Sequence, residues 1–368
     1  MAQASKNNLR VVIFAGGVGT RMWPLSRKAT PKQFEKIIKN KSTLQLTIDR
    51  LRPEIDYKNI YVSTGRSYVD IIKKQLPRVP KENIIGEPEM RDVAPAVGYL
   101  MAILAKQDPN GPVAILWSDH LMKNVSRFKK VINTGAEYIR QNPELFVFLG
   151  EKPRFANQNL GWIEYGAKMT TLNDFKIRKF SSWHYRPKLE KAKKYFDSGR
   201  YAWNPGYFIV SPQFVIDQFK KHVPDMYQAL IKLQSSYGSL NHKKELEKIY
   251  PNLKKTSFDD AILEKISPSQ AVVIPVDLGW SDVGTWEALK EALQTSPSQN
   301  LTKGQVVAWK TKNSLIYNYT DQLVATIDLK GIVVVITKDA VLVTPQESIP
   351  EIKKMLKSFT GTDLEKFT

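Results

Sequence analysis

The chain has 368 residues, of which 42% are hydrophobic, so it can bury a sizeable core in one large domain with a smaller one. It has no cysteine, which excludes disulfides and thiolate metal sites, and its formal net charge of +19 favours anionic partners such as nucleotides, phosphates or nucleic acid. No stretch reaches the roughly 20 apolar residues of a membrane span or has the features of a signal peptide, so we expect a cytoplasmic protein without membrane contact.

The first 150 residues alternate short β-rich runs with amphipathic stretches. Nearly continuous apolar runs at 9–15, 59–64, 113–119 and 145–150 are typical of parallel strands that are covered on both faces. Between them, Leu44, Ile48 and Leu51 form a helical stripe, and 94–105 and 128–139 also have helical patterns. This order predicts an α/β fold with a doubly wound, mostly parallel sheet, which binds ligands at the carboxyl ends of its strands.

The second half of the chain has two different patterns. Residues 151–295 are less regular and rich in aromatic residues, which we interpret as a substrate-facing insertion. Residues 294–300 (QTSPSQN) have the composition of a linker. Short β-branched runs at 314–318, 323–328, 331–337 and 340–344 then predict a small β-coil or meander, followed by a helix from Ile349. We therefore place the domains at 1–295 and 301–368.

A glycine-rich turn from Gly16 to Arg21 follows the first strand directly. Glycines let backbone amides approach phosphate oxygens closely, and a nearby arginine adds paired donors. The turn is neither the GxGxxG of a dinucleotide fold nor a P-loop, because the lysine-bearing half of a P-loop is missing. Taken alone, such a turn is more often structural than phosphate-binding.

Two aspartates have positions that suit metal ligands. Asp119 ends the apolar run 113–119, at the ligand edge of the predicted sheet, although a lone aspartate there more often serves a turn. Asp282 precedes a helical stretch, where N-capping is a competing role. Any metal is expected on oxygen, because the four histidines show no zinc-like spacing, and two hard carboxylates suit Mg²⁺.

A longer stretch carries a resemblance to a known family. Residues 14–34, FAGGVGTRMWPLSRKATPKQF, resemble the signature of the sugar-1-phosphate nucleotidyltransferases, and more narrowly their mannose-1-phosphate guanylyltransferase branch. Further motifs follow in the family's order: GEPEMRDVAPAVGY (86–99), WSDH (117–120), GWIEYG (161–166), YAWNPGYF (201–208) and GWSDVGTW (279–286). The resemblance implies transfer of GMP from GTP to mannose 1-phosphate with Mg²⁺, on a Rossmann-like fold with a β-helix-like C-terminal domain.

The resemblance also assigns roles to residues. It implies a nucleotide-binding part at about 9–150 and a sugar-binding part at about 151–295. The residues that it makes catalytic are Arg21, Lys32, Asp119 and Asp282, the last two as Mg²⁺ ligands. Those that it places around the nucleotide are Ala15, Gly16, Gly17, Gly19, Thr20, Glu87, Arg91, Ala94 and Pro95. Those that it places around the sugar phosphate are Gly161, Tyr185, Arg186 and Asn204.

The sequence departs from the family pattern in two places. The family's Glu-Lys-Pro triplet, which holds sugar hydroxyls and the sugar phosphate, reads Tyr185, Arg186 and Pro187 here. The family's Arg-Asn-Thr-Ala-Pro run carries Asp92 and Val93 in place of the polar pair. Arginine is a planar donor that does not simply replace lysine, and tyrosine lacks the paired acceptors of a carboxylate. These changes concern the choice of sugar.

Other functions are compatible with parts of the sequence. The chain could use another sugar 1-phosphate or nucleotide, or be a regulatory binding module that has lost catalysis, although retention of Asp119 and Asp282 argues against the latter. A nucleic-acid-binding role is suggested only by the charge of +19, and no RNA or DNA module accompanies that charge. We therefore expect GTP and a sugar 1-phosphate as partners and no nucleic acid, and leave a homodimer open.

Overall fold

The computed structural model describes residues 9–17, 19–27 and 29–368, which form two compact units. The larger unit contains residues 9–16, Ile48–Ser118 and Met122–Gly279. The smaller unit contains the described residues of Gly17–Thr47 together with Asp119–Leu121 and Trp280–Thr368. Within the described ranges, no helix is both long enough and apolar enough to cross a membrane.

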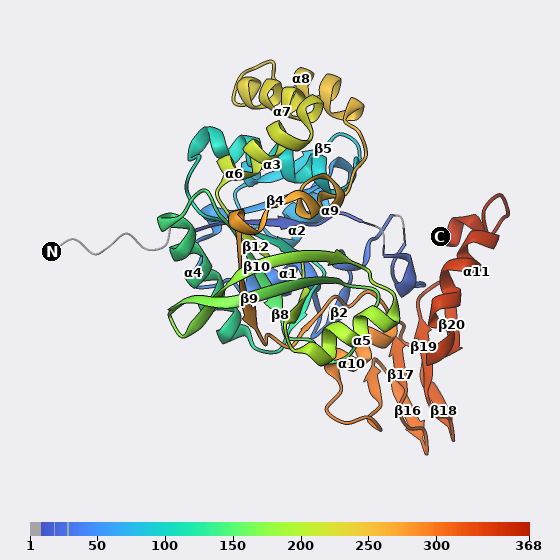
Figure 1. The fold of residues 1–368 in the computed structure, drawn as a ribbon. Coiled ribbons are helices and arrows are strands. Elements are labelled where there is room, and N and C mark those ends of the chain that lie inside the picture. The colour runs from blue at the N-terminus through green and yellow to red at the C-terminus, as the bar shows by residue number, and fades with distance from the viewer. Residues whose placement is uncertain (1–8, 18, 28) are drawn as a thin grey trace. The chain divides into compact units, whose positions relative to one another are not determined.

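A ten-stranded sheet forms the centre of the larger unit (Figure 1). The strands follow the order β11-β9-β10-β13-β8-β12-β6-β1-β4-β5. Their bounds are β1 Arg10–Phe14, β4 Ile60–Gly65, β5 Ile84–Glu87, β6 Val113–Trp117, β8 Phe146–Glu151, β9 Gly161–Leu172, β10 Phe175–Tyr185, β11 Tyr201–Asn204, β12 Phe208–Val210 and β13 Ala271–Val276.

The predicted α/β fold is confirmed. Strands β6, β1, β4 and β5 are parallel neighbours, and β13 is parallel to β8, as the continuous apolar runs indicate. The antiparallel strands β9 to β12 all come from the less regular region after residue 151. Because β11 pairs with both β9 and β8, the strands at this end close into a ring. Because these strands are parallel, their carboxyl ends lie at one edge of the sheet. The residues of the sequence motifs follow those strand ends.

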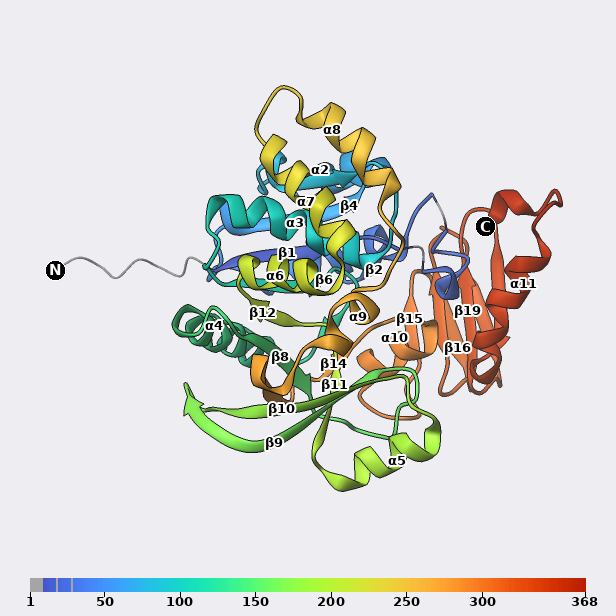
Figure 2. The same ribbon diagram turned by 45° about the horizontal axis from the view of Figure 1, so that its top comes forward.

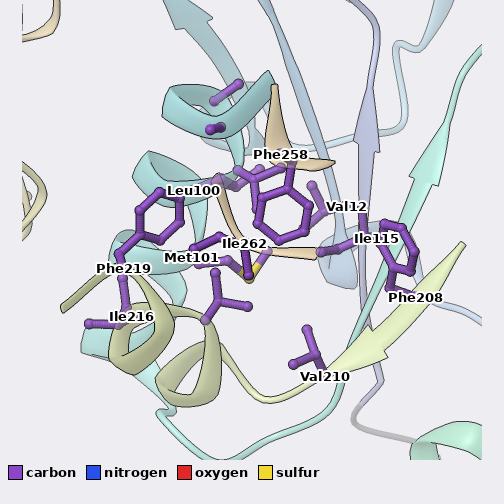
Figure 3. Packing of buried hydrophobic residues seen from close by; sticks show 14 of the residues in the cluster. Val12, Leu100, Met101, Ile115, Phe208, Val210, Ile216, Phe219, Phe258 and Ile262 are labelled. Atoms are coloured by element: carbon purple, nitrogen blue, oxygen red, sulfur yellow. The ribbon is translucent and has the colours of Figure 1, made fainter. Parts of the chain in front are cut away.

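Helices cover both faces of this sheet, with α3, α6 and α7 on one side and α4 on the other (Figures 1 and 2). Helix α3 is apolar on nearly all sides, and Gly98 allows its close packing, since a Cβ there would lie 2.6 Å from Leu230. The core between sheet and helices includes Leu100, Ile115 and Phe258 (Figure 3). The helix bounds are α2 Val69–Gln75, α3 Val93–Gln107, α4 Val125–Gln141, α5 Leu189–Ser198, α6 Pro212–His222, α7 Pro224–Ser236, α8 His242–Ile249 and α9 Phe258–Ala261.

The smaller unit is built on short parallel strands that stack in a coil. Strands β15, β17 and β19 are parallel neighbours, β16 pairs in parallel with β18, and β20 adds an antiparallel edge. The predicted β-helix-like architecture is confirmed. Further bounds in the chain are α1 Thr43–Asp49, β2 Lys36–Ile38, β3 Lys41–Ser42, β7 Leu121–Met122, β14 Trp280–Ser281, α10 Trp286–Leu293, β15 Leu301–Lys303, β16 Val306–Trp309, β17 Leu315–Asn318, β18 Val324–Ile327, β19 Ile332–Ile336, β20 Val341–Pro345 and α11 Ile352–Ser358.

The core of the smaller unit joins segments that are far apart in sequence. Met22 and Trp23, after the glycine turn, pack with Trp286 and with Leu315 and Val333 of the coil. The Trp286 indole donates a hydrogen bond to the Trp23 carbonyl at 3.0 Å. The last α-helix begins at Ile352, three residues later than predicted, because a 3-10 turn that contains Pro350 precedes it. The domain boundary at 295–301 stays a prediction.

Candidate active site

The glycine turn starts at the carboxyl end of β1. The Ala15 amide donates to the Ser63 carbonyl at 2.8 Å, and the Thr64 hydroxyl donates to the Ala15 carbonyl at 2.7 Å. Gly16 is exposed, with space around its Cα, and Gly17 has a φ of +98°, which only glycine adopts without strain. The turn therefore combines a fixed start with an open backbone, as phosphate binding requires.

The Lys32 ammonium, in the smaller unit, is surrounded by oxygen atoms. Lys32 begins the 3-10 turn Lys32–Phe34, and its side chain is only 10% exposed. Its Nζ lies 2.9 Å from Asp119 Oδ2, 3.3 Å from the Asp282 carbonyl oxygen and 3.1 Å from the Val283 carbonyl oxygen. Gly19 makes room for this side chain, because a Cβ there would lie 2.8 Å from the Lys32 Cδ. The ammonium is thus held by one carboxylate and two carbonyls.

The Lys32 ammonium stabilises the charged form of the Asp119 carboxylate. Burial alone would raise the pKa of Asp119, but the Lys32 ammonium and His120 hold that pKa below its usual value. The His120 Nε2 is 3.7 Å from Asp119 Oδ1, and its ring meets the Trp280 ring edge-on at 5.2 Å between centroids. Asp119 therefore stays ionised, and its side chain remains 31% exposed, so a ligand can reach it.

Asp282 lies in a strained loop before α10. Val283 has a φ of +40°, which a β-branched residue rarely adopts and which costs about 1–3 kcal/mol. The cap of α10 is Thr285, whose Oγ1 accepts from the Ala288 amide at 3.1 Å. The competing role of Asp282 as the cap of this helix is therefore not observed. Its Oδ1 accepts a long hydrogen bond of 3.4 Å from the Gly284 amide.

Arg21 lies next to the same loop. A Cβ added to Gly284 would lie 3.2 Å from an Arg21 Nη2 and 3.3 Å from Asp282 Oδ2, so both side chains border this glycine. Arg21, Lys32, Asp119 and Asp282 thus all belong to the smaller unit. They come from three sequence segments, and their catalytic roles stay predictions.

The segment predicted to border the nucleotide belongs to the larger unit. Glu87 ends β5 and is buried, with hydrogen bonds from the Ser63 hydroxyl at 2.9 Å and the Tyr250 hydroxyl at 2.7 Å. Arg91 is paired with Glu89 at 3.1 Å through one Nη, while its buried Nε has no hydrogen-bond partner within the described part of the chain. Ala94 and Pro95 are buried in the first turn of α3.

Three residues predicted to border the sugar phosphate are neighbours across strands. Gly161 of β9 is paired in register with Tyr185 of β10 and with Asn204 of β11. A Cβ on Gly161 would lie 2.5 Å from the Trp183 ring, so glycine is required there. The Asn204 Oδ1 accepts from the Gly206 amide at 2.8 Å, and Gly206 has a φ of +76°, so Gly206 serves a turn.

The two departures from the family pattern adopt unusual backbone conformations. Arg186 has a φ of +44°, and its guanidinium lies over the exposed Tyr185 ring at 4.9 Å. Asp92 caps α3 with a φ of +69° and a ψ of −177°, a region that glycine favours. Asp259, which the sequence did not single out, is coupled to Arg186: burial and the nearby Asp260 and Glu264 raise the pKa of Asp259 to about 6, against the effect of Arg186.

Sequence patterns did not indicate Ser63, Tyr250 or Asp259. Ser63 lies within a strand whose polar members are not distinguished by their spacing, and Tyr250 follows a surface helix. Asp259 is in the first turn of α9, where the Ser257 cap explains an acidic residue without any further role. No local signal in these segments could have identified their partners.

Comparison with known proteins covers most of the chain. Residues 10–299 match the nucleotidyl transferase family, and residues 304–359 match the MannoseP isomerase/GMP-like beta-helix domain. A mannose-1-phosphate guanylyltransferase of Escherichia coli (strain K12) is 32% identical over 358 residues, which are 96% of this chain and 74% of that protein. One of Salmonella montevideo is 33% identical over 354 residues, 94% of this chain and 73% of that protein.

A solved structure is similar over the same extent. The crystal structure of a mannose-1-phosphate geranyltransferase from Thermus thermophilus superimposes with a TM-score of 0.84 at 27% sequence identity. The match covers 96% of this chain and 99% of that chain.

Proposed function

The chain belongs to the nucleotidyl transferase family, in the branch of the mannose-1-phosphate guanylyltransferases, and we propose that it transfers GMP from GTP to mannose 1-phosphate. The products are GDP-mannose and pyrophosphate. The observation that supports this proposal most is the Lys32 ammonium, held by Asp119 and by the carbonyls of the Asp282 loop. A cation and a carboxylate held in fixed positions suit a reaction between two phosphate groups, because that reaction mainly needs alignment and charge neutralisation.

The reaction needs no general base. A phosphate oxygen of the sugar 1-phosphate is already anionic, and it forms a bond to the α-phosphorus of GTP. The bond from the α-phosphorus to the oxygen that bridges to the β-phosphorus breaks, and its electron pair leaves with pyrophosphate. The protein's part is to align the two phosphates and to neutralise charge as the leaving group departs.

We assign this neutralisation to Arg21 and Lys32. Both border the loop that carries Asp282, and both follow a glycine turn whose Gly17 adopts a glycine-specific conformation. Gly16, Gly17, Gly19 and Thr20 are proposed to wrap the nucleotide phosphates with backbone amides. In this assignment the arginine supplies paired donors and the lysine a single point charge.

The residues around Lys32 fit a divalent metal. The donors that already hold one cation, the Lys32 ammonium, are all oxygens: one from the Asp119 carboxylate and two from the backbone carbonyls of Asp282 and Val283. Among residues 9–17, 19–27 and 29–368 there is no group of three or more metal-ligating side chains, so substrate phosphates would complete the shell, as Mg²⁺ prefers. Asp119 and Asp282 would hold the ion, which supplies charge stabilisation to the phosphates when bound.

The sugar phosphate is proposed to lie at the ends of β9, β10 and β11. Gly161, Tyr185 and Asn204 are adjacent there, and the Arg186 fork can grip two phosphate oxygens. Mannose 1-phosphate is favoured because of the family, and the Tyr185 and Arg186 departures keep another sugar 1-phosphate as the alternative. In this proposal residues 1–295 are the catalytic domain and 301–368 the β-rich domain, and a homodimer stays a prediction.

A pyrophosphate-release assay with GTP, mannose 1-phosphate and magnesium tests the proposal. We expect one pyrophosphate for each GDP-mannose, detected by a coupled assay and by chromatography. EDTA should abolish turnover, and excess magnesium should restore it. Binding of GTP without pyrophosphate release would instead indicate a regulatory binding module.

A further inference from the structure

Three parallel strand ends in the larger unit are tied together by hydrogen bonds. Strand β4 lies between β1 and β5. At their carboxyl ends, the Ala15 amide donates to the Ser63 carbonyl at 2.8 Å, and the Thr64 hydroxyl donates back to the Ala15 carbonyl at 2.7 Å. The start of the glycine turn is therefore fixed to the end of β4 by two bonds.

Ser63 extends this connection to β5 through a carboxylate. Its hydroxyl donates to Glu87 Oε1 at 2.9 Å. Ser63 is 1% exposed and Glu87 is 8% exposed, so water does not replace this bond easily. Burial of a carboxylate whose hydrogen-bond partners are neutral costs free energy. Burial accordingly raises the pKa of Glu87 despite its two hydrogen bonds. An apolar residue would fill the same space without that cost.

The second oxygen of Glu87 is held from a distant segment. The Tyr250 hydroxyl donates to Glu87 Oε2 at 2.7 Å, and Tyr250 is fully buried. Tyr250 follows α8 directly, and its ring meets the Tyr99 ring edge-on at 5.7 Å between centroids. The Tyr99 hydroxyl is in turn 2.9 Å from His242 Nε2 at the start of α8. The position of Tyr250 directly after α8 and the packing of its ring against the Tyr99 ring fix where the Tyr250 hydroxyl points.

We propose that Tyr250 is a positioning residue for the nucleotide. Its hydroxyl fixes Glu87, and through Glu87 and Ser63 it fixes the spacing between the strand end at Ala15, where the glycine turn starts, and the segment 87–95. The inference rests on the proposed function, in which these two segments border GTP. Glu87 is 8% exposed and each of its oxygens accepts from a protein hydroxyl, so we assign it a role through the backbone that it anchors.

The Tyr250→Phe variant removes only the hydroxyl, and Tyr99→Phe is its matched control. Both changes delete one buried phenol oxygen from the same pair of rings, but only the first oxygen bonds Glu87. Loss of a hydrogen bond to a charged group predicts that Tyr250→Phe raises the GTP KM about tenfold. We expect kcat and the KM for mannose 1-phosphate to change less than about twofold, with Tyr99→Phe near wild type in all three.

A second variant separates positioning from stability. In Tyr250→Phe/Glu87→Gln, the neutral amide removes the unpaired buried charge, so the urea midpoint should recover towards wild type. The link to α8 stays broken, so the GTP KM should stay raised. Recovery of both the midpoint and the KM would show that Tyr250 acts only through stability, and would overturn the inference.

Direct titration of a fluorescent GTP analogue gives a readout that does not need turnover. An unchanged GTP affinity in Tyr250→Phe overturns the positioning role and leaves the proposed function intact. If wild type turns over another nucleotide in place of GTP, the proposed function fails, and the comparison of Tyr250→Phe with Tyr99→Phe is made with that nucleotide. If wild type binds no nucleoside triphosphate, both proposals are wrong.

Discussion

The residues proposed to handle the phosphates differ in kind from those proposed to hold the sugar. Lys32 and Asp119 form an ion pair with exposed side-chain fractions of 10% and 31%, and they match the family motifs. Tyr185 is 46% exposed and Arg186 has a positive φ, and both depart from the family pattern. A buried ion pair tolerates few substitutions, because loss of one partner leaves the other charge unpaired. Exposed residues such as Tyr185 tolerate substitution more easily. We infer that the chemistry is fixed in the first region and the sugar preference in the second.

Substitution of the aspartates should have the largest effect. Asp119→Asn and Asp282→Asn each remove a charge from the proposed metal and phosphate site, and each should lower kcat on the order of 10²-fold or more. Turnover is measured by pyrophosphate release, and folding by circular dichroism. Thr285→Ala is the control, because it removes the real cap of α10 and should cost about 1 kcal/mol of stability without a comparable loss of kcat. Near-normal turnover of both aspartate variants would contradict the assignment.

Substitution of Lys32 should have the second largest effect on activity. Lys32→Ala should lower kcat/KM by roughly 10- to 100-fold, because a placed cation is lost where charge develops. Lys193→Ala removes the same charge from the exposed face of α5 and should have little effect. Equal losses in the two variants would indicate that the general positive potential of the protein is responsible.

Lys32 also gives a readout without turnover. Since the Lys32 ammonium forms an ion pair with Asp119, it should compete with a free divalent cation for that carboxylate. We expect Lys32→Ala to bind Mn²⁺ more tightly without nucleotide, on the order of tenfold, in an electron paramagnetic resonance titration. Weaker Mn²⁺ binding would mean that Lys32 helps to form the cation site.

Arg186→Ala should have a smaller and more selective effect. It should raise the KM for mannose 1-phosphate about tenfold and leave the KM for GTP nearly unchanged, because a two-pronged contact to the sugar phosphate is lost. Arg186→Lys should recover only part of the affinity, since lysine is a single point donor. A change in the GTP KM instead would place Arg186 on the nucleotide side.

The smallest effect on turnover is expected at Asp259, where the change concerns the pH dependence of stability. Its pKa in the fold is about 6, above the ordinary value of 3.8, so the folded state loses stability as pH rises through this window. Asp259→Asn should remove that loss, about 1–3 kcal/mol between pH 4 and pH 6.5, in urea unfolding curves at several pH values. A stability difference that does not change with pH would show that the pKa is not raised.

Local patterns predicted the parallel strands of the large sheet well. The apolar runs at 9–15 and 113–119 became β1 and β6, and the motifs after them brought Lys32 and Asp119 into contact. This worked because strand ends and glycine turns are specified by neighbouring residues. The choice between Asp282 and Thr285 as helix cap could not be made from sequence, since both residue types cap helices.

Long-range polar contacts were beyond sequence reasoning. The bond between Tyr250 and Glu87 joins residues 163 positions apart, and neither segment has a pattern that specifies the other. The pKa of Asp259 is raised by burial, Asp260 and Glu264 against the opposing effect of Arg186, and these surroundings are set by the tertiary fold. Antiparallel strands β9 to β11 were also missed, because aromatic residues interrupt their alternation.

The central claim is tested most directly by kcat/KM values for pyrophosphate release with four nucleoside triphosphates against a panel of sugar 1-phosphates. We predict the highest value for GTP with mannose 1-phosphate. Because Tyr185 lacks the paired acceptors of a carboxylate, we also predict a preference for mannose over glucose 1-phosphate of less than about 10⁴, the range of a site built on specific hydrogen bonds. A higher value for another nucleotide or sugar would contradict the proposed function, and a preference of about 10⁴ or more would contradict the placement of the sugar contacts.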